Sequence, residues 1–237
     1  MNVDWVAEMP VTEPLRADAR RNRERIITAA SELFAENGVD CLVADVARHA
    51  GLGNATVFRH FPTKLDLIVA VMERRLTDLV AEARAASAMQ DPAAGLQALV
   101  EALCRMHVRD HALKQMASQY FQGSPQLIEL RDTAMVVLED LIARGKTAGV
   151  VREDAEPIDL IVLIGGIADA ASDLETLRPG LWRRYAQLVV AALRPDPTGP
   201  PLDPPVPARE LLEAMWAAKA AAGDCVPAPP RITEPPA

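Results

Sequence analysis

Short polar and basic side chains follow one another within seven residues, at Asn54, Thr56, Arg59 and His60. Amide and hydroxyl side chains can hydrogen-bond to the edges of DNA bases, whereas basic side chains meet phosphate oxygens. A short helix over residues 54–60 would present these side chains outward, as a helix that enters the major groove must do. The residue types and their spacing therefore predict recognition of duplex DNA.

The surrounding residues have the pattern of two short helices joined by a tight turn. We predict these helices over residues 43–50 and 54–60. Gly51 permits the positive φ angle that such a turn needs, and Leu52 is the apolar side chain that fills it. The residues expected to face the core are Val46, Ala47, Ala50, Val57 and Phe61. The segment is thus predicted to be a helix-turn-helix.

Helices on both sides should hold this unit. One is predicted from about Ala17 to Asn37, with an apolar stripe on one face and Gly38 as its stop signal. A long helix should follow Thr63, a favourable N-cap residue, with Asp66 three positions later forming an approximate capping box.

The rest of the chain predicts further helices. No segment shows a convincing alternation of apolar and polar residues with a period of two, so we predict an all-α fold. The expected helices lie near residues 92–106, 112–121, 125–145, 157–172 and 181–192.

Charge is distributed unevenly. Between Pro14 and Lys64 there are seven Arg and one Lys against six acidic residues, a net charge of +2 in a chain of −8, so that the remainder carries −10. A small basic end on an acidic body excludes general nucleic-acid binding but fits local contact with DNA.

Cysteine usage and hydropathy indicate the compartment. Cys41, Cys104 and Cys225 form no CxxC pair, which fits a reducing environment. Residues 1–16 contain no apolar core of signal-peptide length, and the apolar run 160–167 is far shorter than the roughly 20 residues of a membrane span. We expect a soluble, cytoplasmic protein without membrane contact.

Three stretches resemble the N-terminal domain of TetR/AcrR regulators: 23–30 (RERIITAA), 33–38 (LFAENG) and 57–64 (VFRHFPTK). The resemblance covers about residues 17–76. It implies a three-helix helix-turn-helix DNA-binding domain followed by a helical ligand-binding and dimerisation domain. The expected boundaries are a flexible arm 1–16, a DNA-binding domain 17–64, a regulatory domain 65–194 and a Pro-rich tail 195–237 with a candidate short helix.

The resemblance also implies DNA contacts position by position. Asn54 and Thr56 should contact DNA near the start of the recognition helix, and Lys64 should meet a phosphate at the start of the next helix. The full expected set is Arg20, Arg21, Arg23, Ala44, Gly53, Asn54, Ala55, Thr56, Phe58, Arg59, His60 and Lys64.

Three positions depart from the family pattern. Phe58 stands where the family often has a Tyr whose hydroxyl binds phosphate. Leu42 or Val43 stands where Thr or Ser often caps the first helix of the helix-turn-helix, and Gly53 stands where Ser often caps its second helix. Each missing cap lowers the stability of its helix by about 1 kcal/mol. The pattern of apolar residues that pack in the core is unchanged.

Small and aromatic residues near the C-terminus suggest a dimer interface. Gly165 and Gly166 lie inside an apolar helix, which indicates either close helix approach across an interface or a kink beside a ligand pocket. We favour the interface, because the resemblance places dimerisation in the last two core helices. Its expected residues are Gly165, Gly166, Ala168, Trp182, Tyr185 and Leu188, although the aromatic ones could be ordinary core residues.

A small, apolar ligand is expected in the C-terminal domain. The side chains that could line its cavity, or equally serve as ordinary packing, are Met106, His107, Met116, Tyr120, Phe121 and Met135. Cys104, His107 and His111 have a spacing that one continuous helix would place on one face, but a helix break near Asp110 would separate them. We predict no metal and no cofactor.

The sequence therefore predicts a repressor that binds operator DNA as a homodimer and is released by a small ligand. A helical enzyme is the rival from another class, but the chain contains no nucleophile elbow, phosphate loop, zinc-protease or dinucleotide-binding motif, so we predict no enzymatic activity. A ligand-binding or scaffolding dimer that has lost operator binding is the other alternative, motivated by Phe58.

Overall fold

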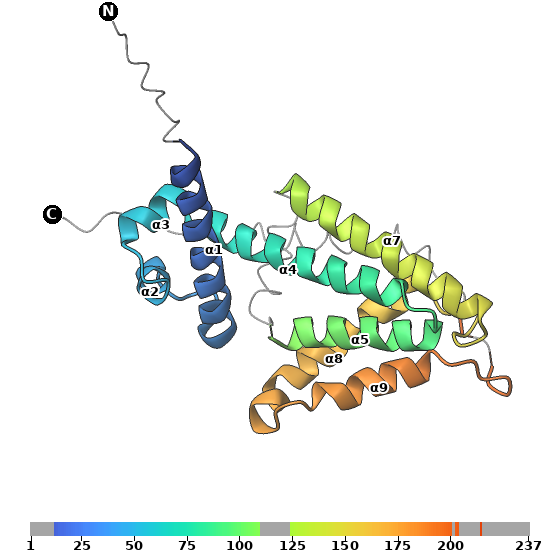
Figure 1. Ribbon diagram of the computed structural model, residues 1–237. Helices are drawn as coiled ribbons and strands as arrows, with labels where there is room; N and C mark the ends of the chain where they lie inside the picture. The colour runs from blue at the N-terminus through green and yellow to red at the C-terminus, as the bar shows by residue number, and fades with distance from the viewer. Residues whose placement is uncertain (1–11, 110–123, 201, 204–213, 215–237) are drawn as a thin grey trace, which may run out of the picture. The chain divides into compact units, whose positions relative to one another are not determined.

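The computed structural model describes residues 12–109, 124–200, 202–203 and 214 (Figure 1). All regular elements in this part of the chain are α-helices, which confirms the predicted all-α class. The chain divides into two compact units, Met1–Val71 and Met72–Ala237. The helices predicted over 112–121 and in the tail lie outside the described residues.

The first unit contains α1 (Thr12–Asn37), α2 (Val43–His49), α3 (Asn54–His60) and the start of α4 (Lys64–Ser87). The first helix begins at Thr12 rather than at Ala17, because a proline is tolerated in the first turn of a helix and Pro14 therefore does not prevent it. Gly38, with φ of 71°, follows the last helical residue as predicted.

Side chains at the start of α4 form the predicted capping box. The backbone N–H of Thr63 donates to Asp66 Oδ2 over 2.9 Å, and the N–H of Asp66 donates to Thr63 Oγ1 over 3.1 Å. Each side chain thereby satisfies a backbone donor that a helix N-terminus leaves without an intrahelical partner.

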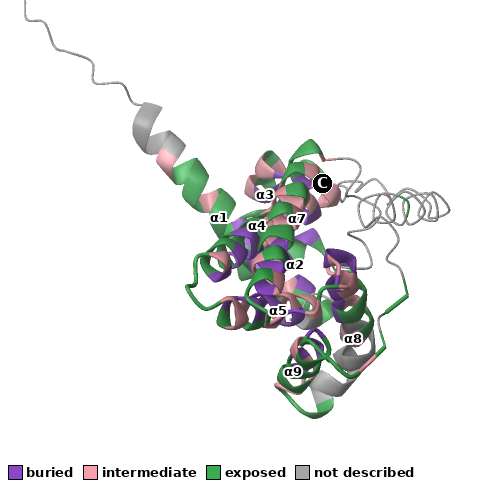
Figure 2. Cartoon of the chain, turned by 90° about the vertical axis from the view of Figure 1, so that its right-hand side faces the viewer, coloured by how far each residue is buried: buried purple, intermediate pink, exposed green. Residues whose placement is uncertain are grey.

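Apolar side chains from α1, α2 and α3 are buried together in the first unit. Ile26 and Ala30, one turn apart on α1, are fully buried, as is Val57 on α3. Figure 2 colours the described helices by burial. Because residues four apart share one face of a helix, the stripe on α1 covers the inner face of the helix-turn-helix. The core of this unit therefore determines which face of α3 points outward.

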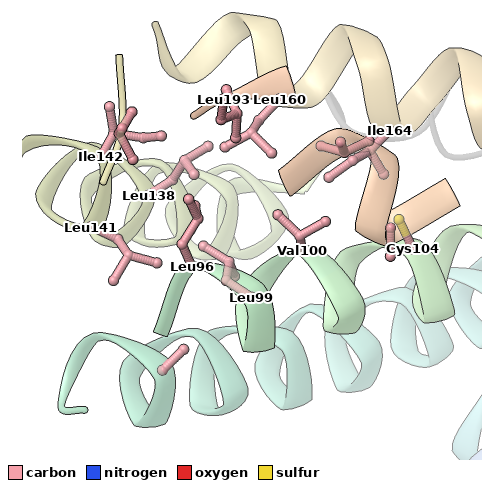
Figure 3. Close-up of a cluster of buried hydrophobic side chains, with 14 of the residues drawn as sticks. Leu96, Leu99, Val100, Cys104, Leu138, Leu141, Ile142, Leu160, Ile164 and Leu193 are labelled. Atoms are coloured by element: carbon pink, nitrogen blue, oxygen red, sulfur yellow. The ribbon is translucent and has the colours of Figure 1, made fainter. Parts of the chain in front are cut away.

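The second unit consists of the remainder of α4 together with α5 (Pro92–Arg109), α7 (Pro125–Thr147), α8 (Pro157–Leu177) and α9 (Trp182–Ala192). Its core surrounds α5, which contacts α7, α8 and α9. Leu96, Leu99 and Val100 of α5 point toward buried leucines and isoleucines of α7 and α8 (Figure 3). No helix among the described residues is long and apolar enough to cross a membrane.

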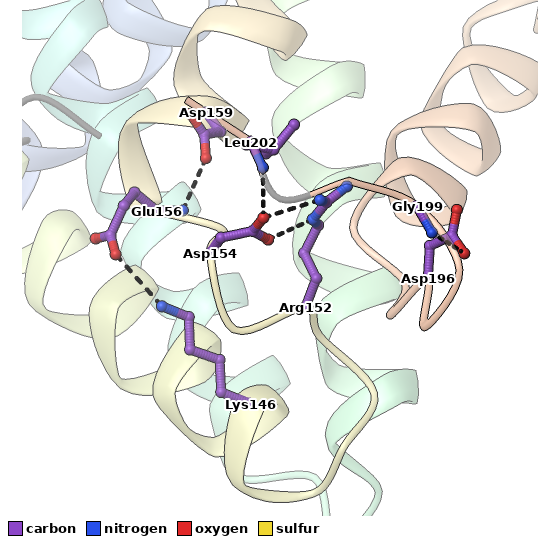
Figure 4. Close-up of polar contacts among 8 residues, drawn as sticks. All are labelled: Lys146, Arg152, Asp154, Glu156, Asp159, Asp196, Gly199 and Leu202. Atoms are coloured by element: carbon purple, nitrogen blue, oxygen red, sulfur yellow. Dashed lines mark hydrogen bonds and ion pairs between the residues drawn. The ribbon is translucent and has the colours of Figure 1, made fainter. Parts of the chain in front are cut away.

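The segment after α9 is held against the loop between α7 and α8. Arg152 pairs with Asp154 through two hydrogen bonds, and Asp154 Oδ2 accepts a hydrogen bond of 2.8 Å from the N–H of Leu202 (Figure 4). Asp196 accepts hydrogen bonds from the backbone of Thr198 and Gly199, which forms a local turn. The described part of this Pro-rich segment therefore has defined contacts with the loop between α7 and α8.

Candidate nucleic-acid interface

The turn between α2 and α3 has the predicted helix-turn-helix geometry. Gly51 has φ of +63°, in the left-handed region that glycine adopts without strain. The N–H of Gly51 donates to the carbonyl oxygen of Arg48 over 3.1 Å, and the N–H of Leu52 donates to that of Ala47 over 2.9 Å. These bonds close the end of α2 and reverse the chain into α3.

The two faces of α3 differ in burial. Val57 and Phe61 are buried, as their spacing of four residues predicted. Asn54, Ala55 and Arg59 are exposed, and Thr56 is half-buried beside them. A helix of this kind offers two short polar side chains near its N-terminus and a basic one near its C-terminus, which is the arrangement needed to read base edges and meet phosphates.

Two of the expected contact residues are more enclosed than the pattern implied. Phe58 and His60 are half-buried, and His60 Nε2 is buried without a hydrogen-bond partner among the described residues. Burial, and then the positive charges of Arg59 and Arg23, lower the pKa of His60 below its ordinary value. The lowered pKa disfavours the protonated imidazole, and with it a role for His60 as a cationic phosphate ligand.

The arginines expected to reach phosphates lie on α1. Arg20, Arg21 and Arg23 are all exposed. Arg21 forms an ion pair with Asp18 one turn earlier, and the Arg23 guanidinium lies 5.2 Å from the centre of the Phe61 ring. A cation above an aromatic face is held by the ring quadrupole, so Arg23 also connects α1 to the end of α3.

The remaining expected contacts lie at helix starts. Ala44 is exposed in the first turn of α2, and Lys64 is the half-buried first residue of α4. Neither Leu42 nor Gly53 caps the helix that follows it with a side-chain hydrogen bond, which confirms the missing caps. Leu42 is 67% exposed.

One contact in this unit was missed by the sequence reasoning. Arg25 Nη2 donates a hydrogen bond of 2.7 Å to the carbonyl oxygen of Ala50, at the end of α2. The two residues are 25 positions apart, and no spacing rule relates a residue of one helix to the backbone of another at that distance. Only the packing of α1 against α2 brings them together.

In the second unit, the residues expected at a dimer interface separate into two groups. Gly166 is exposed, and Leu188 of α9 has 51% of its surface exposed. Val162, one turn before Gly166, is 57% exposed. Gly165 and Tyr185 are half-buried, and the side chain at position 168 lies outside the described set. Trp182 is instead buried in the core of the second unit, where α9 packs on α5, which is the alternative that the sequence left open.

A cavity of about 170 Å³ lies in the second unit between α4 and α5. Met106 lines it, but most of the other lining side chains carry charge. His107 Nδ1 donates to the carbonyl oxygen of Leu103 over 2.9 Å, and Met135 packs against the core. Positions 116, 120 and 121 lie outside the described residues. The cavity is lined by Arg75, Asp78, Leu79, Glu82, Ala102, Arg105 and Met106.

Cys104 is part of the core of the second unit rather than of a polar cluster. Its side chain is buried among apolar residues of α5, α7 and α8, and burial followed by the nearby Glu101 raises the pKa of the thiol to about 11. A protonated, buried thiol is a poor metal ligand. His111, the third member of the considered metal group, lies outside the described residues.

Comparisons with known proteins agree with this geometry. The sequence profile of the bacterial regulatory proteins of the tetR family matches residues 26–71, and that of the C-terminal domain of SbtR-like transcriptional regulators matches residues 89–195. An HTH-type transcriptional regulator of Staphylococcus aureus strain USA300 is 41% identical over 63 residues, which are 26% of this chain and 34% of that protein. The chain thus matches about a third of the length of this curated relative.

Solved structures match over most of the chain. A TetR transcription regulatory protein from Mycobacterium vanbaalenii is 30% identical with a TM-score of 0.59, and the match covers 77% of this chain and 100% of that one. A TetR transcriptional regulator from Streptomyces coelicolor is 27% identical with a TM-score of 0.58, over 73% of this chain and 98% of that one. The chain therefore belongs to the tetR family of helix-turn-helix transcriptional regulators.

Proposed function

We propose that this chain is a cytoplasmic transcriptional repressor that binds operator DNA as a homodimer and leaves it when a small ligand binds the second unit. The observation that carries the proposal is the division of α3 into a buried face, with Val57 and Phe61, and an exposed face that begins with Asn54, beside the half-buried Thr56. The exposed arginines on α1 supply charge beside it.

The dimer is supported by an exposed apolar face on the last two helices. Val162, Leu163 and Leu188 are exposed although they are large and apolar, and Gly166 adds a position without a side chain among them. Large apolar side chains exposed on two helices that pack against each other favour an interface, because a second copy of the chain would bury them. Two copies would then present two helix-turn-helix units to two half-sites.

For the ligand, we propose a chemical class. The cavity between α4 and α5 combines Met106 and Leu79 with charged groups such as Arg75 and Glu82. Its volume of about 170 Å³ is smaller than the roughly 300–1,000 Å³ of most ligand pockets, so a compact ligand with at least one polar group fits it better than a large apolar one. A ligand shifts the protein away from DNA only if it binds the DNA-incompetent form more tightly.

Selection of DNA by the purified protein tests the function directly. The protein would be incubated with a library of random-sequence duplexes, the bound fraction amplified, and the affinity of the enriched duplex measured at several salt concentrations. Enrichment of a roughly palindromic sequence, with affinity that falls steeply as salt rises, is expected. Dimers that enrich no sequence would instead support the ligand-binding or scaffolding role that the missing Tyr hydroxyl at Phe58 suggested.

A further inference from the structure

The turn of the helix-turn-helix contains two carbonyl groups that lie beyond the hydrogen-bond ladder of α2. The last bonds of that ladder run from the N–H groups of Ala50, Gly51 and Leu52 to the carbonyl oxygens of Val46, Arg48 and Ala47, over 2.8, 3.1 and 2.9 Å respectively. The carbonyl oxygens of Ala50 and Gly51 therefore point onward from the C-terminal end of the helix. Such groups need a donor from elsewhere, and the negative end of the helix dipole favours a cationic one.

Arg25 of α1 supplies this donor. Its Nη2 atom lies 2.7 Å from the carbonyl oxygen of Ala50 and 3.5 Å from that of Gly51. The shorter contact is a charge-assisted hydrogen bond, which is stronger than one between neutral groups. The first helix is thereby tied to the turn at the point where the chain changes direction.

The same guanidinium also limits which residue the turn can contain. A Cβ atom at Gly51 would lie 3.1 Å from Arg25 Nη2, and the φ of +63° already disfavours any residue with a side chain. Glycine at 51 and arginine at 25 therefore fit one another, because the absence of a Cβ atom leaves room for the guanidinium against the backbone.

The position of α3 depends strongly on the turn before it, because no side chain caps this helix. Gly53 precedes α3 without a capping hydrogen bond, and the helix is only seven residues long. Helices of that length are not stable by themselves and depend on tertiary contacts for their position. The buried Val57 and Phe61 hold the far part of α3, whereas its start follows directly from the turn.

We propose that Arg25 is a positioning residue for DNA recognition, which holds the turn between α2 and α3 through the carbonyl oxygens of Ala50 and Gly51 and so sets the orientation of the recognition helix. The inference rests on the proposed DNA-binding function. Arg25 acts on DNA through α3 and not through a phosphate of its own, because its guanidinium is engaged with protein backbone. Arg21 is the contrasting case, since its guanidinium lies on the surface in an exposed ion pair with Asp18.

The test replaces each arginine by an unbranched apolar residue of similar length, as Arg25→Met and Arg21→Met, and adds Arg25→Lys as the conservative variant. Native-state hydrogen exchange reports the opening of the turn without any DNA, through the amides of Leu52, Thr56 and Val57. The second measurement is affinity, at several salt concentrations, for a duplex selected by the wild-type protein from a random library and for a scrambled duplex of the same composition.

For Arg25→Met we expect exchange at the three amides to become about tenfold faster or more, while core amides of α1 and of the second unit are unchanged. Preference for the selected duplex over the scrambled one should fall about tenfold, with the salt slope unchanged. Arg21→Met should leave exchange unchanged and reduce the salt slope by about one. Arg25→Lys should restore part of the protection, because an ammonium can also donate to a carbonyl oxygen.

Two outcomes would overturn the inference. Unchanged exchange in Arg25→Met would show that the turn does not depend on this side chain. A salt slope reduced by one, with duplex preference unchanged, would show that Arg25 is a phosphate ligand. If even the wild-type protein selects no duplex, the proposed function fails, whereas the exchange measurement still decides whether Arg25 holds the turn.

Discussion

Gly95 of α5 lies so close to Ala86 of α4 that a Cβ atom at position 95 would be 2.6 Å from the Ala86 carbonyl oxygen. That oxygen belongs to the backbone and cannot move aside as a flexible side chain could. Leu141 of α7 closes the other side, with its Cδ1 atom 3.3 Å from the same point. The second unit is therefore packed around a glycine that three helices share.

Gly95→Ala should destabilise the protein although alanine is the better helix former. The added methyl group must separate α4 from α5, and overpacking of this kind costs about 1–3 kcal/mol in the free energy of unfolding. Urea denaturation measures the change. As a control, Ala94→Gly at the exposed neighbouring position should cost about 1 kcal/mol through helix propensity alone. A more stable Gly95→Ala variant would contradict the close approach.

Gly166→Leu should dissociate the proposed dimer without unfolding the protomer. Among the described residues, no heavy atom outside the local backbone lies within 4 Å of a Cβ atom at this position, which leaves room for a larger side chain. A packed interface formed by α8 and α9 would have no room for this side chain, so the added volume should separate the two copies. Analytical ultracentrifugation, with circular dichroism as a check of folding, measures the result.

The matched control for that variant is Ala143→Leu, which adds a leucine side chain at an exposed position of α7. Its sedimentation should equal that of the wild type. A Gly166→Leu protein that is folded and still dimeric would show that the interface lies elsewhere.

Asn54, Thr56 and Lys64 should contribute to DNA binding in different ways. Replacing Asn54 or Thr56 by Ala should cost about 1–3 kcal/mol of binding free energy and relax the preference at one base pair. Lys64→Ala should weaken binding to all sequences alike and reduce the salt slope by about one. Affinities for selected and scrambled duplexes at several salt concentrations separate the two effects.

Phe58→Tyr extends the same measurement. If a phosphate lies where the family resemblance places it, the new hydroxyl group should tighten binding to selected and scrambled duplexes equally. Unchanged binding in all four variants, with the fold intact, would mean that α3 does not dock on DNA in the proposed manner.

Gly53→Ser should stabilise the first unit. Gly53 has φ of −76° and ψ of 149°, which any residue adopts, and a Cβ atom there would meet nothing within 4 Å. A serine hydroxyl could accept a hydrogen bond from the first turn of α3, and the unfolded chain would lose glycine's freedom, together worth about 0.5–1 kcal/mol. Denaturation of Gly53→Ser beside Gly53→Ala isolates the cap, because alanine cannot form it. Equal stability of the two variants would argue against capping.

Asp154 should make the attachment of the segment after α9 depend on pH. The Arg152 guanidinium, and then the N–H of Leu202, hold the pKa of this carboxyl well below its usual range. A lowered pKa in the folded state means that the attachment is complete above the ordinary carboxyl pKa of about 3.9 and is lost as pH falls below it, through the lowered value. Hydrogen exchange at Leu202 across this range measures the loss.

Asp154→Asn should lower the protection of the Leu202 amide against exchange at neutral pH. The further loss of protection at acid pH should then be absent. Asp203→Asn, at an exposed neighbouring position, is the matched control and should behave as the wild type. If the Leu202 amide exchanges equally fast in all three proteins, Asp154 does not hold the segment.

Local patterns in the sequence predicted the elements that local physics controls. The turn at Gly51 and the capping box of Thr63 and Asp66 depend on backbone conformation and on hydrogen bonds between near neighbours, so residue type and spacing are sufficient. The buried face of α3, with Val57 and Phe61, follows from the period of the helix. The start of α1 was placed too late, because Pro14 does not end a helix whose first turn it occupies.

Contacts between distant residues were decided by the tertiary structure alone. Arg25 reaches Ala50, and Gly95 meets Ala86, only because pairs of helices pack at particular distances and angles that no spacing along the chain encodes. Trp182 has the residue type of either an interface or a core position, and the packing of α9 on α5 determined that it is core. The sequence thus determined which helices form and which face of each is apolar, whereas the fold determined which of these faces meet, because burial depends on every neighbour at once.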